Sequence, residues 1–135
     1  MRLLLIHAHS FEYAVTEKTA VSKVVRPMTE AEKGGKVGDS LVCFTAIETP
    51  DLKNSRELVA KALQAVQKHF LQIKAGSLML YPYAHLSSDL APPKDAQSIM
   101  DLFVQQAEEL FKGVTVSHAP FGYYKSFQVA CKGHP

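Results

Sequence analysis

The amino-acid sequence predicts an α/β domain of the α+β type, in which one mixed β-sheet carries two main helices. Three observations support this prediction. With 135 residues, the chain can bury a hydrophobic core without disulfides or a metal. Its hydrophobic fraction of 47% and charged fraction of 21% are typical of a globular protein. Short strand-like runs and two helical segments follow one another without the regular alternation of a doubly wound sheet.

Three strands are predicted in the first part of the chain. Residues 3–6 form a continuous apolar run, which is typical of a strand covered on both faces. Residues 11–16 place apolar side chains at every second position, which predicts a separate, half-exposed strand. Residues 27–39 are polar and glycine-rich and are predicted to form a loop. Residues 41–47 are rich in strand-forming types and predict the third strand.

The first predicted helix follows this strand. Asn54 and Glu57 have the spacing of an N-terminal capping box. Apolar residues then recur at helical spacing as far as Ile73, and Gly76 is the predicted stop.

The second helix is flanked by the remaining strands. Residues 78–81 predict a strand that ends at Pro82. The helix opens at Pro92-Pro93 and closes at Gly113. Residues 114–116 and 124–131 predict the last two strands. No repeat or linker interrupts the chain, so residues 1–135 are interpreted as one domain.

Bulk properties restrict the class of protein. The net charge of +2 is too small to imply nucleic-acid binding by itself. After Glu109 the chain carries lysines among aromatic residues and no acid, a pattern that fits either an RNA contact or a strand that packs its aromatics inward. Cys43 and Cys131 form no CxxC pair and indicate reduced thiols. The apolar opening is too short for a signal peptide or a membrane span, so a soluble, cytoplasmic protein is expected.

Lys125 is the most informative single residue. Strand alternation puts it on the same face as Tyr123, Phe127 and Val129, which is otherwise apolar. A lysine there must pair, extend its ammonium to water, or lie in a site that uses its charge. From the residues alone, the default expectation is that the ammonium extends to water. In a site that uses its charge, Lys125 would instead be an electrostatic clamp for negative charge.

Two further segments, 81–88 and 7–9, place polar side chains at the ends of predicted strands, where sites are commonly built. His85 lies in the first of these segments, and a histidine after a strand is more often structural than catalytic. The two serines that follow are typical of an ordinary turn. His7 and His9 lack the spacing of a metal site, and no phosphate-binding loop is present. No metal and no cofactor are therefore expected.

Several short sequence segments resemble the N-terminal editing domain of archaeal threonyl-tRNA synthetases, and they occur in the same order as in that family. They are Leu4-Leu5-Ile6-His7, Glu12-Tyr13, Tyr81-Pro82-Tyr83-Ala84-His85-Leu86-Ser87-Ser88, Ala119-Pro120-Phe121-Gly122-Tyr123-Tyr124-Lys125 and Cys131-Lys132-Gly133-His134-Pro135. The resemblance covers nearly the whole chain. It implies a D-aminoacyl-tRNA deacylase-like fold and a homodimer. Because the sequence ends at Pro135 directly after the last predicted strand, a domain excised from a longer synthetase is expected.

The resemblance also implies a function: hydrolysis of mischarged L-seryl-tRNA(Thr), with threonyl-tRNA(Thr) spared. Lys125 would orient the water or stabilise the oxyanion, the backbone of Tyr83 and Ala84 would hold the amino acid, and His85 would lie beside its side chain. Near the terminal adenosine at the tRNA 3' end would lie Ile47, Phe121 and Tyr124, and Gly122 would be a further substrate-binding position. Two alternatives stay open: a D-aminoacyl-tRNA deacylase, and a non-catalytic module for tRNA binding or dimerisation.

Two features depart from the family pattern. His9 stands where the pattern leads us to expect an aspartate. The family also continues beyond the Gly-His-Pro block to a glutamate near the pocket.

Overall fold

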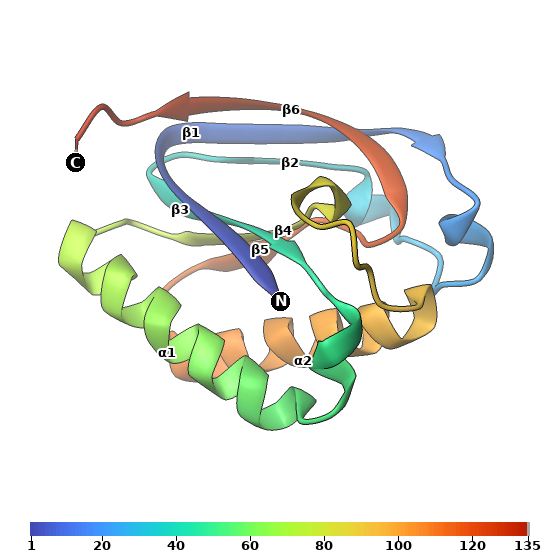
Figure 1. Ribbon diagram of the computed structural model, residues 1–135. Coiled ribbons are helices and arrows are strands. Elements are labelled where there is room, and N and C mark those ends of the chain that lie inside the picture. The colour runs from blue at the N-terminus through green and yellow to red at the C-terminus, as the bar shows by residue number, and fades with distance from the viewer. Residues whose placement is uncertain (135) are drawn as a thin grey trace.

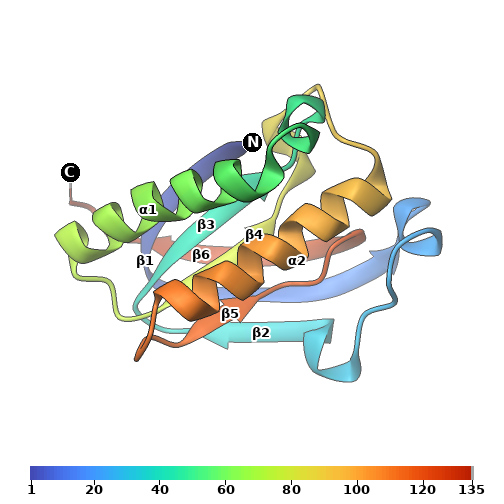
Figure 2. The same ribbon diagram turned by 90° about the horizontal axis from the view of Figure 1, so that it is seen from below.

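The computed structural model describes residues 1–134, which form a curled mixed sheet with two helices packed on one face (Figures 1 and 2). The strands are β1 (Arg2–Lys18), β2 (Gly34–Val37), β3 (Ser40–Ala46), β4 (Leu78–Pro82), β5 (Val116–His118) and β6 (Tyr123–Cys131). The helices are α1 (Ser55–Ile73) and α2 (Pro93–Leu110). Four 3₁₀ turns within the described residues connect them: η1 (Val21–Lys23), η2 (Glu30–Lys33), η3 (Thr49–Leu52) and η4 (Ala84–Leu86).

The sheet has the order β2-β1-β3-β4-β5, and β6 pairs with β1. β1 runs antiparallel to β2, β3 and β6, whereas the β3–β4 and β4–β5 pairs are parallel. Figure 1 shows the result: β1 and β6 arch over β3 and β4, while α1 and α2 lie on the opposite side.

The prediction of two separate strands at residues 3–6 and 11–16 is wrong, because both belong to β1. Residues 2–8 pair with β3, and residues 8–18 pair with β6. Register shifts between Ala8 and Ser10 and between Val15 and Glu17 mark irregularities at which such a strand can bend without leaving the sheet. One strand can therefore serve two parts of the curled sheet.

The predicted loop at residues 27–39 also contains structure, η2 and the edge strand β2. β2 pairs with the second half of β1, and Gly35 lies opposite Tyr13. A Cβ atom at Gly35 would come within 2.7 Å of the Tyr13 ring, so the glycine is needed for this close approach. The glycine-rich composition that indicated a loop therefore belongs to an edge strand that packs under the Tyr13 ring.

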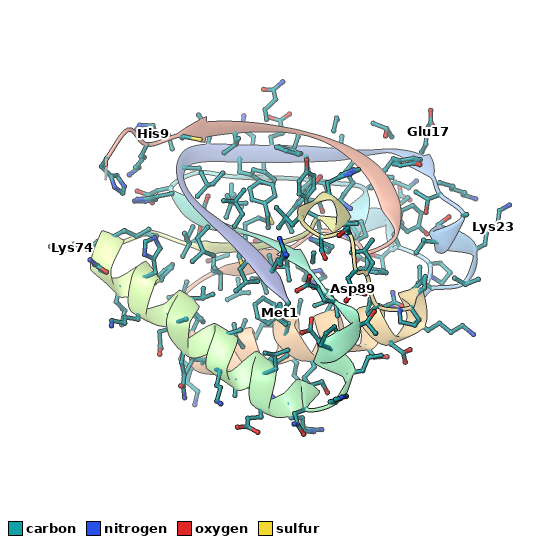
Figure 3. The ribbon with its side chains drawn as sticks, viewed as in Figure 1. Met1, His9, Glu17, Lys23, Lys74 and Asp89 are labelled. Carbon is teal, nitrogen blue, oxygen red and sulfur yellow. The ribbon has the colours of Figure 1, made fainter. Side chains whose placement is uncertain are left out.

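Both helices are confirmed, but the capping of the first differs from the prediction. Asn54 occupies the N-cap position of α1, yet its side chain makes no capping hydrogen bond. The last helical residue is Ile73, as predicted, but the helix is terminated by the C-cap residue Lys74, which adopts a left-handed conformation with φ 55°, and not by Gly76 (Figure 3). The N–H of Gly76 instead donates to the Asp39 carboxylate, at 3.0 Å.

The segments around the second helix follow the prediction closely. α2 begins at Pro93, where the missing N–H costs no helical hydrogen bond. β4 ends at Pro82 and β6 covers the predicted range within one residue, but β5 begins two residues later than predicted.

The hydrophobic core has two parts, one on each face of the sheet. Leu41 and Cys43 of β3 point toward the helices, whereas Val42 and Phe44 point into the concave side. This explains why all of β3 is buried. The Cys43 and Cys131 thiols are free, and only Cys43 is buried.

Within residues 1–134, no helix combines the length and the apolar character needed to cross a lipid bilayer.

Candidate functional site

Lys125 shares one face of β6 with Phe127 and Val129, as strand alternation predicted, and this face lines the concave side of the sheet. Along β6, partly buried residues alternate with exposed ones up to the last two positions, and Lys125 belongs to the partly buried set. Its Nζ donates hydrogen bonds to the backbone carbonyls of Pro120, at 3.0 Å, and Tyr123, at 3.2 Å. The ammonium is therefore held inside the fold and not extended to water, so the default expectation for this side chain is wrong.

The surroundings of the ammonium favour interaction with a negative group. Nζ lies 5.1 Å from the centre of the Tyr81 ring, within the range of a cation–π contact. Burial lowers the pKa of Lys125 to about 8, because the charged form loses hydration. An ammonium has three N–H donors, and the two hydrogen bonds to carbonyls leave one for a ligand oxygen.

Aromatic rings form the floor beside Lys125. The Tyr81 ring contacts Phe11 at 5.3 Å, Phe44 at 5.4 Å and Phe127 at 5.5 Å between centroids. These residues come from four different strands and are joined by edge-to-face contacts. Such a floor excludes water on one side of the ammonium and strengthens its electrostatic effect.

The segment after β4 brings Tyr83, Ala84 and His85 to the same side. The Tyr83 N–H donates to the Thr45 carbonyl at 2.8 Å, and Ala84 opens the η4 turn. The Tyr83 ring contacts Tyr81 at 6.2 Å on one side and His85 at 5.2 Å on the other. An uninterrupted series of contacts therefore connects Lys125 with His85.

The bend before β6 fixes the Pro120 carbonyl that Lys125 uses. Gly122 adopts φ 90°, a conformation that other residues rarely take. A Cβ atom there would also lie 2.9 Å from Val25, and the Gly122 carbonyl accepts a hydrogen bond from Thr19 Oγ1 at 2.6 Å. The bend is thus packed against the segment that follows β1.

The structure separates the other predicted site residues from this group. Ile47 is only 3% exposed and belongs to the helix-side core, and Phe121 packs against the same cluster. Tyr124 is 56% exposed and lies on the face of β6 opposite Lys125. Lys125, Tyr83 and His85 form one group, from which the side chains of Ile47, Phe121 and Tyr124 are set apart.

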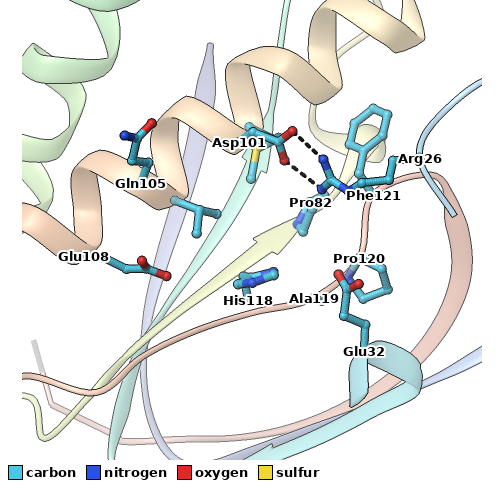
Figure 4. Close-up of a pocket in the computed structure, with 12 residues that line it drawn as sticks. Arg26, Glu32, Pro82, Asp101, Gln105, Glu108, His118, Ala119, Pro120 and Phe121 are labelled. Carbon is cyan, nitrogen blue, oxygen red and sulfur yellow. Dashed lines mark hydrogen bonds and ion pairs between the residues drawn. The ribbon is translucent and has the colours of Figure 1, made fainter. Parts of the chain in front are cut away.

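A pocket of about 200 Å³ lies between α2 and the Pro120 bend (Figure 4). The Arg26 guanidinium spans it and forms two hydrogen bonds with the Asp101 carboxylate, at 2.7 and 2.9 Å. Other lining residues are Glu32, Glu108, His118 and Phe121. Sequence reasoning missed this pocket, because its polar groups come from distant segments with no fixed spacing.

His7, from the third predicted segment, lies in a separate polar cluster. Its Nε2 is hydrogen-bonded with Asp39 Oδ1 at 2.9 Å, and its Nδ1 with His134 Nε2 at 2.7 Å. Lys132 Nζ donates to Asp39 at 2.6 Å, and this bond, followed by the one from His7, lowers the pKa of Asp39 well below its usual range. Among residues 1–134 no group of three or more His, Cys, Asp or Glu side chains is arranged to hold a metal. Pro135, the last residue of the Gly-His-Pro block, lies outside the described residues.

Comparison with known proteins gives a family match over the entire chain. The model of a family described as the archaea-specific editing domain of threonyl-tRNA synthetase matches residues 1–135. The threonine–tRNA ligases of Pyrococcus furiosus and Pyrococcus horikoshii are each 44% identical over 135 residues, and that of Methanosarcina mazei is 41% identical. These alignments cover 100% of this chain but only 20–21% of the relatives, so the chain spans about a fifth of their length.

A solved structure shares the fold. The c-Myc DNA Unwinding Element Binding Protein superimposes with a TM-score of 0.67, covering 98% of this chain and 93% of that chain at 12% sequence identity. At this identity the likeness concerns the fold alone. The predicted fold class, a mixed sheet with two main helices, is confirmed.

Proposed function

Because the chain belongs to the archaea-specific editing domain family of threonyl-tRNA synthetase, we propose that it hydrolyses mischarged L-seryl-tRNA(Thr) and spares threonyl-tRNA(Thr). The observation that supports the chemistry best is Lys125, a partly buried ammonium beside an aromatic floor with one donor left for a ligand. The proposed partners are the 3' end of tRNA(Thr) and the rest of the synthetase.

The need for such a reaction follows from the size of the two amino acids. Threonine and serine differ by one methyl group, so a synthetic site that accepts threonine also admits serine. A methyl-sized difference contributes only about 1–3 kcal/mol of discrimination, which is too little for accurate translation. A second, hydrolytic site can act on the product that the first site fails to reject.

The reaction requires a placed water and a positive group near the ester carbonyl. Water adds to the carbonyl carbon, negative charge develops on the carbonyl oxygen, and the bond to the ribose oxygen then breaks. The leaving ribose oxygen takes one proton from the attacking water and becomes a hydroxyl group, while the remaining OH stays on the carbonyl carbon of the released serine. The third N–H of Lys125 would donate to the developing oxyanion, where a fixed positive group lowers the barrier.

The amino acid would be held beside η4. The Tyr83 N–H already donates to Thr45, so we assign the backbone contact with the substrate to the Ala84 peptide group. His85 would lie against the serine side chain, where an added methyl group would meet its ring. Phe121 and Tyr124 are proposed to lie along the path of the terminal adenosine, and Ile47, whose side chain is buried, would contribute through its backbone. Gly122 is proposed as a further substrate-binding position in the same bend.

The decisive experiment is a panel of charged tRNAs. We expect the protein to release L-serine from seryl-tRNA(Thr) and to leave L-threonyl-tRNA(Thr) largely intact at the same protein concentration. Equal decay of both esters would overturn the proposal. Preferential release of D-amino acids would indicate a D-aminoacyl-tRNA deacylase, and binding without release would indicate a non-catalytic module.

The rate of seryl-tRNA(Thr) hydrolysis is expected to fall as the pH rises through about 8, the pKa of Lys125. Above this pH the amine is neutral and no longer stabilises an oxyanion. Single-turnover rates from about pH 6.5 to about pH 9.5, with spontaneous ester hydrolysis subtracted at each pH, would measure the effect. The residual rate of Lys125→Arg should not show this fall, because the guanidinium stays charged. A wild-type rate that remains level across this range would contradict the expectation.

We propose that the domain forms a homodimer, on the basis of its family membership. Sedimentation equilibrium at micromolar concentration should then give a mass of about 30 kDa, twice the chain mass of 14.9 kDa. A single species at the chain mass would refute this proposal.

A further inference from the structure

We propose that Ser87 and Glu48 act as a positioning pair that holds the site loop, residues 83–87, in the geometry that distinguishes serine from threonine. This inference rests on the proposed function. Neither residue is among the predicted site residues, and the sequence indicated only turn chemistry for Ser87.

The contact between the two side chains is short and charge-assisted. Ser87 Oγ donates to Glu48 Oε2 at 2.6 Å. This hydrogen bond, followed by the one from the Met1 ammonium, lowers the pKa of Glu48, so the carboxylate remains ionised. The Glu48 side chain is only 18% exposed, which protects the contact from competing water.

Glu48 is itself fixed from several sides. Its Oε2 also accepts a hydrogen bond from Arg2 Nε at 3.3 Å, at the start of β1. Its backbone N–H donates to Asp51 at 2.7 Å, and Glu48 forms an isolated β-bridge with Leu90. The carboxylate is therefore a rigid anchor between the end of β3 and the segment after β4.

The site loop depends on this anchor at its far end. At its near end, the Tyr83 N–H is bonded to Thr45 at 2.8 Å. Between the two ends, η4 is closed only by long hydrogen bonds: Leu86 N to the Tyr83 carbonyl at 3.4 Å and Ser87 N to the Ala84 carbonyl at 3.3 Å. A turn with such weak internal bonds keeps its shape only if both ends are held.

The position of His85 follows from these constraints. His85 lies between the two fixed ends, and its ring rests against Tyr83 at 5.2 Å. To exclude one methyl group, the ring must stay within a fraction of an ångström of its place. A displacement of about 1 Å in a site can cost roughly 10²-fold in rate, so a loosened loop should lower both rate and selectivity.

The test compares Ser87→Ala, Ser87→Thr and Glu48→Ala with the double variant Ser87→Ala/Glu48→Ala. Matched controls are Ser98→Ala, whose hydroxyl donates to the Lys94 carbonyl within α2, and Glu57→Ala, whose side chain is exposed on the surface of α1. For each variant, kcat and KM are measured with seryl-tRNA(Thr) and threonyl-tRNA(Thr). Thermal unfolding shows which variants fold.

We expect Ser87→Ala to lower kcat/KM for seryl-tRNA(Thr) roughly 10-fold. The ratio of kcat/KM for seryl-tRNA(Thr) to that for threonyl-tRNA(Thr) should also fall. Ser87→Thr keeps the hydroxyl and should restore most of the rate. The double variant should lose less than the product of the two single effects, because both substitutions remove the Ser87–Glu48 contact. The separate contacts, from the Asp89 N–H to Ser87 Oγ and from Arg2 to Glu48, are lost in one single variant each. The proposal is overturned if Ser87→Ala matches Ser98→Ala, or if the two effects multiply. If Glu48→Ala fails to fold, the comparison of Ser87→Ala with Ser87→Thr decides.

Failure of the proposed function would be visible separately, as a wild-type protein that releases no serine. In that case amide hydrogen exchange tests the anchor alone. The backbone amides at positions 86 and 87 should exchange about 10-fold faster in Ser87→Ala than in Ser98→Ala. Equal exchange in the two variants would overturn the positioning role.

Discussion

Replacing Lys125 with methionine is expected to lower the rate of seryl-tRNA(Thr) hydrolysis by about 10²–10³, the usual effect of losing one preorganised oxyanion donor. Methionine keeps most of the apolar stem that carries Nζ over the Tyr81 ring, so the fold should persist. Single-turnover release of serine would measure the loss. The rate constant should fall more than the affinity for the tRNA, because the charge acts mainly in the transition state.

Two companion variants sharpen this experiment. Lys125→Arg should also be impaired, because a planar guanidinium cannot occupy the place of Nζ between the Pro120 and Tyr123 carbonyls. Lys61→Met removes a lysine that is 73% exposed on α1, and it should leave the rate unchanged. If Lys125→Met releases serine as fast as the wild type, the proposed mechanism is wrong.

The largest expected effect on stability comes from Phe11→Ala. Phe11 is fully buried, and its ring contacts Phe44, Tyr81 and Phe127. Truncating a buried phenylalanine to alanine leaves a cavity and typically lowers the free energy of unfolding by about 3–5 kcal/mol. Urea unfolding, followed by circular dichroism, would give the change.

An exposed side chain supplies the control for this measurement. Leu71 is 66% exposed on α1, and Leu71→Ala should change the free energy of unfolding by less than about 0.5 kcal/mol. A loss below about 1 kcal/mol in Phe11→Ala would show that the aromatic floor can collapse around the missing ring.

The helices and most strands could be predicted because their signals are local. Helical spacing identified α1 and α2, and strand alternation placed Lys125 among apolar neighbours. β1 could not be read as one strand, because polar residues interrupt its apolar pattern at the point where it changes partner. β2 was missed because its segment is rich in glycine, which is typical of a loop, whereas Gly35 is required here for the close approach to the Tyr13 ring.

The site was predictable only in part, for a related reason. Lys125 belongs to a short continuous motif, and so does the segment from Tyr83 to His85. The residues that support them do not. Glu48 lies 39 positions from Ser87, and Thr19, which holds the bend before β6, lies 103 positions from Gly122. Contacts between such distant positions depend on the curvature of the sheet, which no local pattern encodes.

The burial of Lys125 also has a cost for folding. The pKa of Lys125 is depressed to about 8 in the folded protein, whereas the unfolded chain keeps the ordinary lysine value, so at neutral pH the charge opposes folding. The penalty is relieved as the pH rises through the folded pKa, because the folded state then sheds its proton before the unfolded state does. The same penalty is absent in Lys125→Met. The domain therefore gives up conformational stability at neutral pH and keeps a poorly hydrated cation at the proposed site of ester hydrolysis.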